Sequence, residues 1–319
     1  MSFCSKSMAS STRYLSIVIV SWNTRDLLRR CLFSVDAQSL PESHGPPEVF
    51  VVDNASSDGS PEMVRAEFPQ VRLIENLGNV GFATANNQAL AIARGDLRIL
   101  LNPDTVLLPG ALATLIRFMD DCPAAGAAGA NLLNPDGTLQ NSAYPMLGLG
   151  RELWQLFHLD RIGRLASYPL SDWAGGDPHR VGVAQGACLA LRREALDQVG
   201  LLDEQYFMYT EEVDLCYRLA RGGWEVYWVP QARVLHFGGQ STRQAEVEMF
   251  LALYQSKVRF FRKHFGNRAA RAYKLILGLA SVPRLFTRAV GAPVSGDELS
   301  PQSSVAHRYR RLLASLHQM

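Results

Sequence analysis

The stretch Ile99-Leu100-Leu101-Asn102-Pro103-Asp104 is a short apolar run that ends in a carboxylate. Such a run, closed by a turn signal, is typical of a strand buried on both faces in the middle of a parallel sheet. Ligands of open α/β sheets bind at the carboxyl ends of the strands, which is where we expect Asp104 to lie. A lone acid there can hold a divalent cation against a diphosphate, because hard cations take oxygen ligands.

A second copy of the same pattern, Leu132-Leu133-Asn134-Pro135-Asp136, provides an internal comparison. Gly137 follows it and short apolar stretches flank it on both sides, as a hairpin turn requires. We therefore predict a turn at the second copy. At Asp104 the motif alone leaves both a turn and a metal site open, so the neighbouring segments must decide.

Two runs rich in β-branched residues predict the first strands of an α/β unit. Residues 15–20 lead to Ser21-Trp22-Asn23, with Thr24 as the expected N-cap of a helix, and residues 49–52 lead to Asp53. No GxGxxG follows the first run and no Walker A motif is present, which excludes the common dinucleotide and P-loop fingerprints. Asp53 can accept hydrogen bonds from a nucleobase N–H or a ribose hydroxyl, although capping of the next helix is the alternative.

Polar side chains also follow the later apolar segments. A short predicted strand at 71–74 leads into a glycine-containing turn with Asn79 and Gly81, and Asn86 lies in the helix that comes next. These residues can line a ligand site, or the asparagines can cap helices. His236 ends a further apolar stretch, where a core position and a ligand position are both open.

Three acids, Glu211, Glu212 and Asp214, lie in the first turn of a predicted helix with Thr210 as its N-cap. The helix dipole favours acids there, and Asp214 is spaced to pair with Arg218, so a structural role explains them. A role as general base requires one of the glutamates to face a nucleotide pocket.

Composition sets outer limits on function. A net charge of +2 is too small to indicate nucleic acid as the main binding partner. The five cysteines are scattered and form no CxxC, which indicates neither a zinc site nor a disulfide framework and favours a reducing cytoplasm. No stretch reaches the roughly 18 to 20 apolar residues that a membrane-spanning helix needs. Residues 1–13 are expected to be a disordered leader.

Basic and apolar residues alternate from Tyr254 to Arg288, and acids are absent there. One interpretation is an amphipathic stretch that lies on an anionic membrane surface. The other is a helix that packs its apolar side on the catalytic domain and keeps a solvated basic face. Gly278 and Pro283 are expected to break the segment before it could span a bilayer.

Together and in this order, these segments resemble the family-two glycosyltransferases with the GT-A fold, in particular their bacterial rhamnosyltransferase-like branch. The resemblance covers residues 14–265. The matching motifs lie at 18–23, 51–60, 76–86, 100–104, 186–188, 207–216 and 236–242. Each motif alone is weak, but seven in register are a specific signal.

The resemblance implies an α/β fold with a mixed, mostly parallel sheet flanked by helices. It implies a GT-A catalytic domain at 14–243, with a nucleotide-sugar half near 14–130 and an acceptor half near 131–243. A basic, amphipathic helical extension at 244–319 follows.

The resemblance also assigns roles to single residues. Asp104 and His236 are implied to bind Mg²⁺ or Mn²⁺ on the donor diphosphate, and Asn102 replaces the first acid of the family's Asp-x-Asp-like motif. The family's catalytic base belongs to a Glu-Asp pair, which here reads Glu211-Glu212, and the role falls on Glu212. The implied contacts with the donor nucleotide sugar are Asp53 at the nucleobase and Ser21, Asn23, Asn79, Gly81, Asn86 and Asn102.

The implied reaction is an inverting transfer of a sugar, with rhamnose from dTDP-rhamnose as the best assignment, to a hydroxyl of a glycan or a polyprenyl-diphosphate-linked saccharide. The implied enzyme is cytoplasmic, with peripheral contact to the inner face of the cell membrane, and a homo-oligomer stays open. A nucleotidyltransferase that forms sugar nucleotides and a non-catalytic nucleotide-binding protein remain as alternatives.

Overall fold

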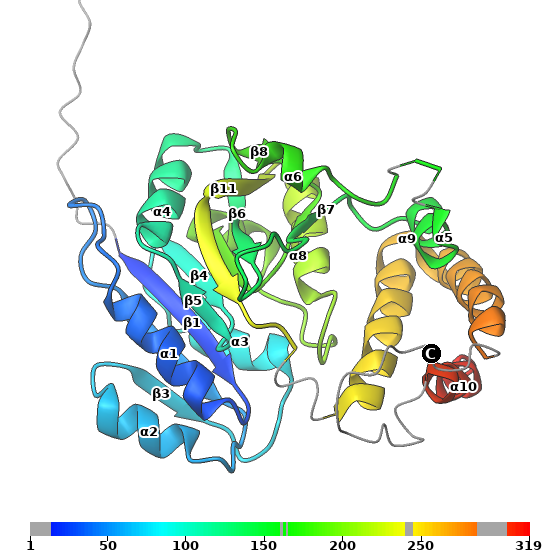
Figure 1. The fold of residues 1–319 in the computed structure, drawn as a ribbon, viewed down its shortest axis with the longest axis horizontal. Helices are drawn as coiled ribbons and strands as arrows, with labels where there is room; N and C mark the ends of the chain where they lie inside the picture. Colours follow the sequence, from blue (N-terminus) through cyan, green and yellow to red (C-terminus); the bar gives the residue numbers. More distant parts are fainter. Residues whose placement is uncertain (1–13, 160–161, 164, 240–244, 286–304) are drawn as a thin grey trace, which may run out of the picture.

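The computed structural model describes residues 14–159, 162–163, 165–239, 245–285 and 305–319 (Figure 1). The expected leader, residues 1–13, lies outside the described residues. A large sheet with helices against it occupies one side of the molecule, and a group of helices, mostly from the C-terminal part of the chain, occupies the other (Figure 1).

The large sheet runs in the order β3-β2-β1-β4-β10-β6-β11-β5, and β8 pairs with β11. Its strands are β1 (Leu15–Ser21), β2 (Glu48–Asp53), β3 (Arg72–Glu75), β4 (Leu97–Leu101), β5 (Thr105–Leu107), β6 (Ala125–Leu133), β8 (His179–Arg180), β10 (Cys188–Arg192) and β11 (Glu225–His236). The half formed by β3, β2, β1 and β4 is parallel, as is the pair of β6 and β11. Strand β10 is antiparallel to both β4 and β6, and β5 is antiparallel to β11. The predicted strand before Asp104 is therefore a central strand of a mixed sheet.

A small second sheet pairs β7 (Ala143–Tyr144) with β9 (Val183–Ala184). The helices are α1 (Arg25–Asp36), α2 (Ser60–Glu67), α3 (Phe82–Leu90), α4 (Ala111–Asp121), α5 (Leu149–Leu156), α6 (Leu170–Trp173), α7 (Arg193–Val199), α8 (Glu211–Arg221), α9 (Glu246–Arg284) and α10 (Val305–Ser315).

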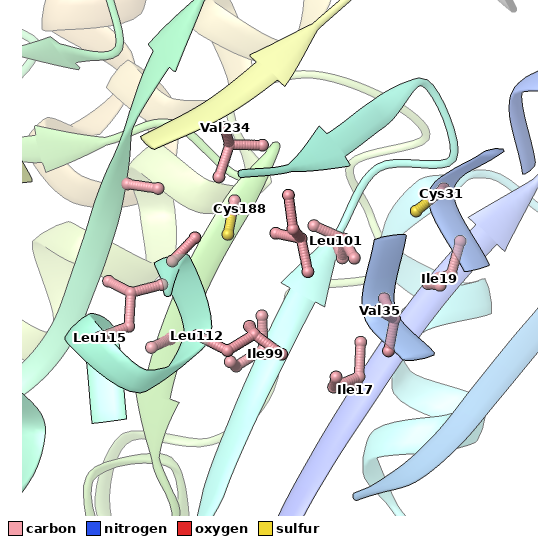
Figure 2. Packing of buried hydrophobic residues seen from close by; sticks show 14 of the residues in the cluster. Ile17, Ile19, Cys31, Val35, Ile99, Leu101, Leu112, Leu115, Cys188 and Val234 are labelled. Carbon is pink, nitrogen blue, oxygen red and sulfur yellow. The ribbon is translucent and has the colours of Figure 1, made fainter. Parts of the chain in front are cut away.

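Successive side chains of a strand point to opposite faces of the sheet, so each strand contributes to two cores, one on each face. Ile17 and Ile19 of β1 belong to one core with side chains of α1, α2 and α4, whereas Val18 and Val20 belong to the other with side chains of α3, α7 and α8. In the first core, Ile99 of β4 lies between side chains of α1 and α4 (Figure 2). The central strands are apolar on both faces because helices cover both.

The long helix α9 bends at Gly266, whose φ of 82° is left-handed. The expected break at Gly278 is wrong, because the helix continues through it to Arg284 and includes Pro283 in its last turn. Tyr273, Leu277 and Ala280 on either side of Gly278 are buried in a third core that α5, α9 and α10 form. This packing outweighs the roughly 1 kcal/mol that a glycine costs inside a helix.

Helix α9 contacts α8 through the carboxylate of Asp214, whose side chain is fully buried. The predicted partner Arg218 donates to Asp214 over 2.7 Å, and Lys263 and His264 of α9 also lie 2.7 Å from its carboxylate. Burial alone would raise the pKa of Asp214, but the hydrogen bonds from Lys263, Arg218 and His264 outweigh burial and lower that pKa. Helix α9 thus contacts the first turn of α8, the helix that carries Glu211 and Glu212.

Two local predictions need correction. Thr24 and Thr210 occupy the N-cap positions of α1 and α8, but neither side chain caps its helix. The Thr24 hydroxyl instead lies 3.0 Å from that of Ser21. The apolar stretch that His236 ends is part of the long strand β11, which passes through an irregularity between Val229 and Arg233.

Candidate active site

A pocket of about 200 Å³ opens beside the carboxyl end of β4 and the start of α8. Six of the predicted site residues line it: Asn79, Asn102, Asp104, Glu211, Glu212 and His236. Further lining residues that were not predicted as site residues include Trp22, Asn54, Gln185, Met208 and Tyr209. The pocket thus brings the candidate metal ligands and the candidate bases into one space.

The strand pairing places Asp104 and His236 opposite each other. Asp104 lies in the turn between β4 and β5, and His236 at the end of β11 pairs with Thr105 at the start of β5. Both side chains are buried, and Asp104 Oδ1 lies 3.4 Å from His236 Nε2. One carboxylate oxygen and one imidazole nitrogen that face each other fit a divalent cation such as Mn²⁺.

Among the described residues, no group of three or more His, Cys, Asp or Glu side chains is placed to hold a metal ion. Asp104 and His236 would therefore supply two ligands only. The remaining ligands would come from the diphosphate and water, as is usual for Mg²⁺ at phosphate sites.

The other predicted donor contacts lie next to the pocket and do not line it. Asn23 joins the loops after β1 and β2, since its Oδ1 accepts from Ser57 N–H over 2.8 Å. Asn86 donates to the Phe82 carbonyl within α3 over 2.8 Å. The Ser21 hydroxyl contacts Thr24. These contacts shape the loops around the pocket.

Asp53 is buried at the end of β2, and Ser56 N–H donates to its Oδ2 over 2.8 Å. Burial raises the pKa of Asp53. Its Oδ1 is buried without a hydrogen-bond partner among the described residues. An acceptor in that state favours a donor group from a ligand, because an unpaired buried polar atom is costly.

Gly81 occupies a position that only glycine fits. Its φ is 87°, and a Cβ there would lie 2.6 Å from the carbonyl oxygen of Phe207. The next residue, Phe82, donates its N–H to that same carbonyl over 2.7 Å. Gly81 therefore allows the start of α3 to approach the loop that leads to α8.

Glu211 and Glu212 begin α8 at the pocket, and each has one buried oxygen without a hydrogen-bond partner among the described residues. Burial and the charge of Glu212 raise the pKa of Glu211 well above its usual value. Burial also raises the pKa of Glu212, but backbone hydrogen bonds of Glu212, Val213 and Thr210 oppose the rise. When the pair carries one proton, these surroundings favour a neutral Glu211 and an ionised Glu212.

The loop that precedes the two glutamates is strained. Tyr209 and Thr210 both have left-handed φ values, 66° and 72°. Such conformations cost of the order of 1–3 kcal/mol each and persist where the surroundings enforce them. Helix α9 supplies part of that restraint, because the Ser256 hydroxyl donates to the Met208 carbonyl over 3.0 Å.

Comparison with known proteins shows the family to which the chain is similar. Residues 16–200 match the family described as glycosyl transferase family 2. The chain is 32% identical over 275 residues to the N-acetylglucosaminyl-diphospho-decaprenol L-rhamnosyltransferase of Mycobacterium tuberculosis, and the match covers 80% of this chain and 86% of that protein.

Two solved structures share the fold at 18% sequence identity. A mannosyltransferase from Pyrobaculum calidifontis in complex with GDP-Man and Mn²⁺ has a TM-score of 0.57, and the match covers 96% of this chain and 85% of that one. GalNAc-T7 with UDP, GalNAc and Mn²⁺ has a TM-score of 0.55, and the match covers 70% of this chain and 43% of that one.

Proposed function

The chain belongs to glycosyl transferase family 2 and has the GT-A fold, and from this premise we propose that it transfers rhamnose from dTDP-rhamnose to a lipid-linked saccharide. Both expectations about family and fold are confirmed, and so is the expectation of a glycosyltransferase. Family membership decides against the sugar-nucleotide-forming and non-catalytic alternatives. The observation that carries the proposed chemistry is the pocket that Asp104, His236 and Glu212 share.

In the proposed reaction, Glu212 takes the proton from an acceptor hydroxyl as that oxygen attacks the anomeric carbon of the donor sugar. The bond between the anomeric carbon and the diphosphate oxygen breaks in the same step, which inverts the configuration. Asp104 and His236 would hold Mg²⁺ or Mn²⁺, which supplies positive charge to the departing diphosphate. Asp53 accepts a hydrogen bond from the nucleobase through its unpaired Oδ1.

The donor sugar and the acceptor class rest on the mycobacterial relative, whose name specifies L-rhamnose and a diphospho-decaprenol acceptor. We assign to this chain the same chemical class, a polyprenyl-diphosphate-linked saccharide. Hydrolysis of the donor without acceptor tests the sugar, since it needs only the donor site. A panel of dTDP-rhamnose, dTDP-glucose, UDP-N-acetylglucosamine and GDP-mannose with Mg²⁺ or Mn²⁺ is expected to give the highest rate for dTDP-rhamnose.

The control for this panel is the Asp104→Ala variant in the same assay. The variant measures the hydrolysis that does not depend on the proposed metal site. If another donor is hydrolysed fastest by the wild-type protein, the assignment of rhamnose is wrong while the reaction class stands. If no donor is hydrolysed above the rate of the variant, the proposed donor site itself is wrong.

We also propose that the enzyme contacts the cytoplasmic face of the cell membrane through one face of α9. No helix in the described part of the chain combines the length and apolar character needed to cross a bilayer. Basic side chains in the first half of the predicted basic segment form ion pairs with the rest of the protein. Lys257 pairs with Glu152 over 2.9 Å, and Lys263 pairs with Asp203 over 2.7 Å. The first half of α9 therefore packs on the protein.

The second half of α9 differs, because an exposed row runs along it. Leu275, Leu279 and Val282 are 65%, 58% and 48% exposed, and Arg268 and Arg271 on the preceding turns are exposed as well. The spacing of three or four residues places all five on one helix face. Apolar side chains of this kind can enter the headgroup boundary, while each arginine near anionic lipid contributes about 1 kcal/mol.

Co-sedimentation with vesicles that contain anionic lipid tests this face. We expect the intact protein to bind at low salt and to be released as salt rises, because the arginines act through screened charges. Replacing Leu275 and Leu279 by serine should reduce binding, whereas the matched control Leu77→Ser should not, since Leu77 is fully exposed at a distant turn. Unchanged binding of the double variant, or equal loss in the control, would contradict the proposal.

A further inference from the structure

The side chain of Gln140 lies behind His236, on the side away from Asp104. Gln140 Nε2 lies 2.6 Å from the backbone carbonyl oxygen of His236 and 2.8 Å from Asn134 Oδ1. Gln140 Oε1 lies 2.9 Å from His236 Nδ1. Gln140 and His236, which are 96 positions apart in the chain, are thus joined by two hydrogen bonds at the edge of the pocket.

The backbone carbonyl of His236 fixes the orientation of the Gln140 amide. A carbonyl oxygen only accepts, so the Gln140 atom that faces it must be the NH₂ group. The other amide atom is then the oxygen, which also only accepts. His236 Nδ1 must therefore carry the proton of the hydrogen bond that joins the two side chains.

A chain of hydrogen bonds fixes the same orientation from the other side. Hydrogen bonds from the hydroxyl and the backbone N–H of Thr138 lower the pKa of Asp136, so its carboxylate is an acceptor at neutral pH. The Thr138 hydroxyl donates to Asp136 over 2.6 Å and accepts from Asn134 Nδ2 over 2.8 Å. Asn134 therefore presents its oxygen to Gln140.

The tautomer determines what His236 offers to the pocket. A neutral imidazole has one N–H, so a proton on Nδ1 leaves a bare lone pair on Nε2. His236 Nε2 lies 3.4 Å from Asp104 Oδ1, and two acceptors that face each other attract a cation between or beside them. A metal-binding histidine commonly has its tautomer fixed by a partner at its other ring nitrogen.

We propose that Gln140, held by Asn134, is a positioning residue that keeps His236 protonated on Nδ1 and leaves Nε2 as a ligand for a divalent cation beside Asp104. The inference rests on the metal site of the proposed function. It also gives the hairpin at 134–138, which resembles the Asp104 motif in sequence, a role in orienting the histidine.

Nitrogen-15 NMR of the seven histidines tests the tautomer directly in the metal-free protein at pH 8. The His236 signal is assigned as the one lost in His236→Asn. We expect wild-type His236 to be protonated on Nδ1. In Gln140→Leu the acceptor at Nδ1 is lost, so we expect the proton to move to Nε2, where Asp104 can accept it.

Binding of Mn²⁺ with dTDP, followed by calorimetry, provides the second measurement. Gln140→Leu is expected to weaken Mn²⁺ binding about 10- to 100-fold, the usual effect of removing a partner of a metal-binding histidine. Gln70→Leu, which removes an amide that contacts Asp36, serves as the matched control and should change neither measurement.

Two results would overturn the inference. One is a wild-type His236 protonated on Nε2 or on both nitrogens. The other is a Gln140→Leu variant that binds Mn²⁺ as tightly as Gln70→Leu. Neither result would bear on Asp104 as a metal ligand, which the Asp104→Ala variant tests separately.

Discussion

Replacing Asp104 by alanine is expected to reduce the affinity for dTDP in the presence of Mn²⁺ to the value measured with a chelator. The Asp104 carboxylate faces His236 in the pocket, with 3.4 Å between Oδ1 and Nε2. Because a divalent cation takes oxygen ligands, His236 and the diphosphate alone would hold it weakly. Calorimetric titration of dTDP with Mn²⁺ and with chelator measures the metal-dependent part of binding.

The control is Asp121→Ala, which removes an exposed acid at the end of α4. It leaves the pocket intact, so we expect metal-dependent binding to remain. Asp104→Asn should give an intermediate loss, since the amide keeps one oxygen and removes the charge. Equal metal-dependent affinity in Asp104→Ala and Asp121→Ala would show that the cation binds elsewhere.

The strands around the site could be predicted because their signal is local. The apolar runs at 15–20, 49–52 and 99–101 lie in β1, β2 and β4, and each is followed by a polar side chain at the sheet edge. The antiparallel insertion of β10 between β4 and β6 has no such signal. It depends on pairing between residues far apart in the chain, which periodicity does not report.

The site could be predicted in part for the same reason. The pair of Asp214 with Arg218 follows from their spacing on one helix, whereas the contacts of Asp214 with Lys263 and His264 join α8 to α9. Likewise the contact of Gln140 with His236 forms only when the hairpin after β6 lies beside the end of β11. Only tertiary packing brings such residues together, so no sequence spacing indicates them.

Glu212→Gln is expected to lower turnover about 100- to 10,000-fold, the usual contribution of a general base, while the affinity for the donor stays nearly unchanged. Glutamine keeps the shape of the side chain and cannot take a proton. Turnover of the wild-type enzyme should rise with pH through the raised pKa of the pair, because the base acts only when it is ionised. Initial rates with donor and acceptor at saturation, measured as a function of pH, test the loss of turnover and its pH dependence.

Glu211→Gln is the matched control, since both residues lie in the first turn of α8 at the same pocket. The surroundings favour a neutral Glu211 whenever Glu212 is ionised. Glutamine imitates that neutral acid, so the variant should keep substantial turnover and a similar pH at which turnover rises. If instead Glu211→Gln loses turnover and Glu212→Gln keeps it, Glu211 is the base and its higher pKa should set the pH dependence.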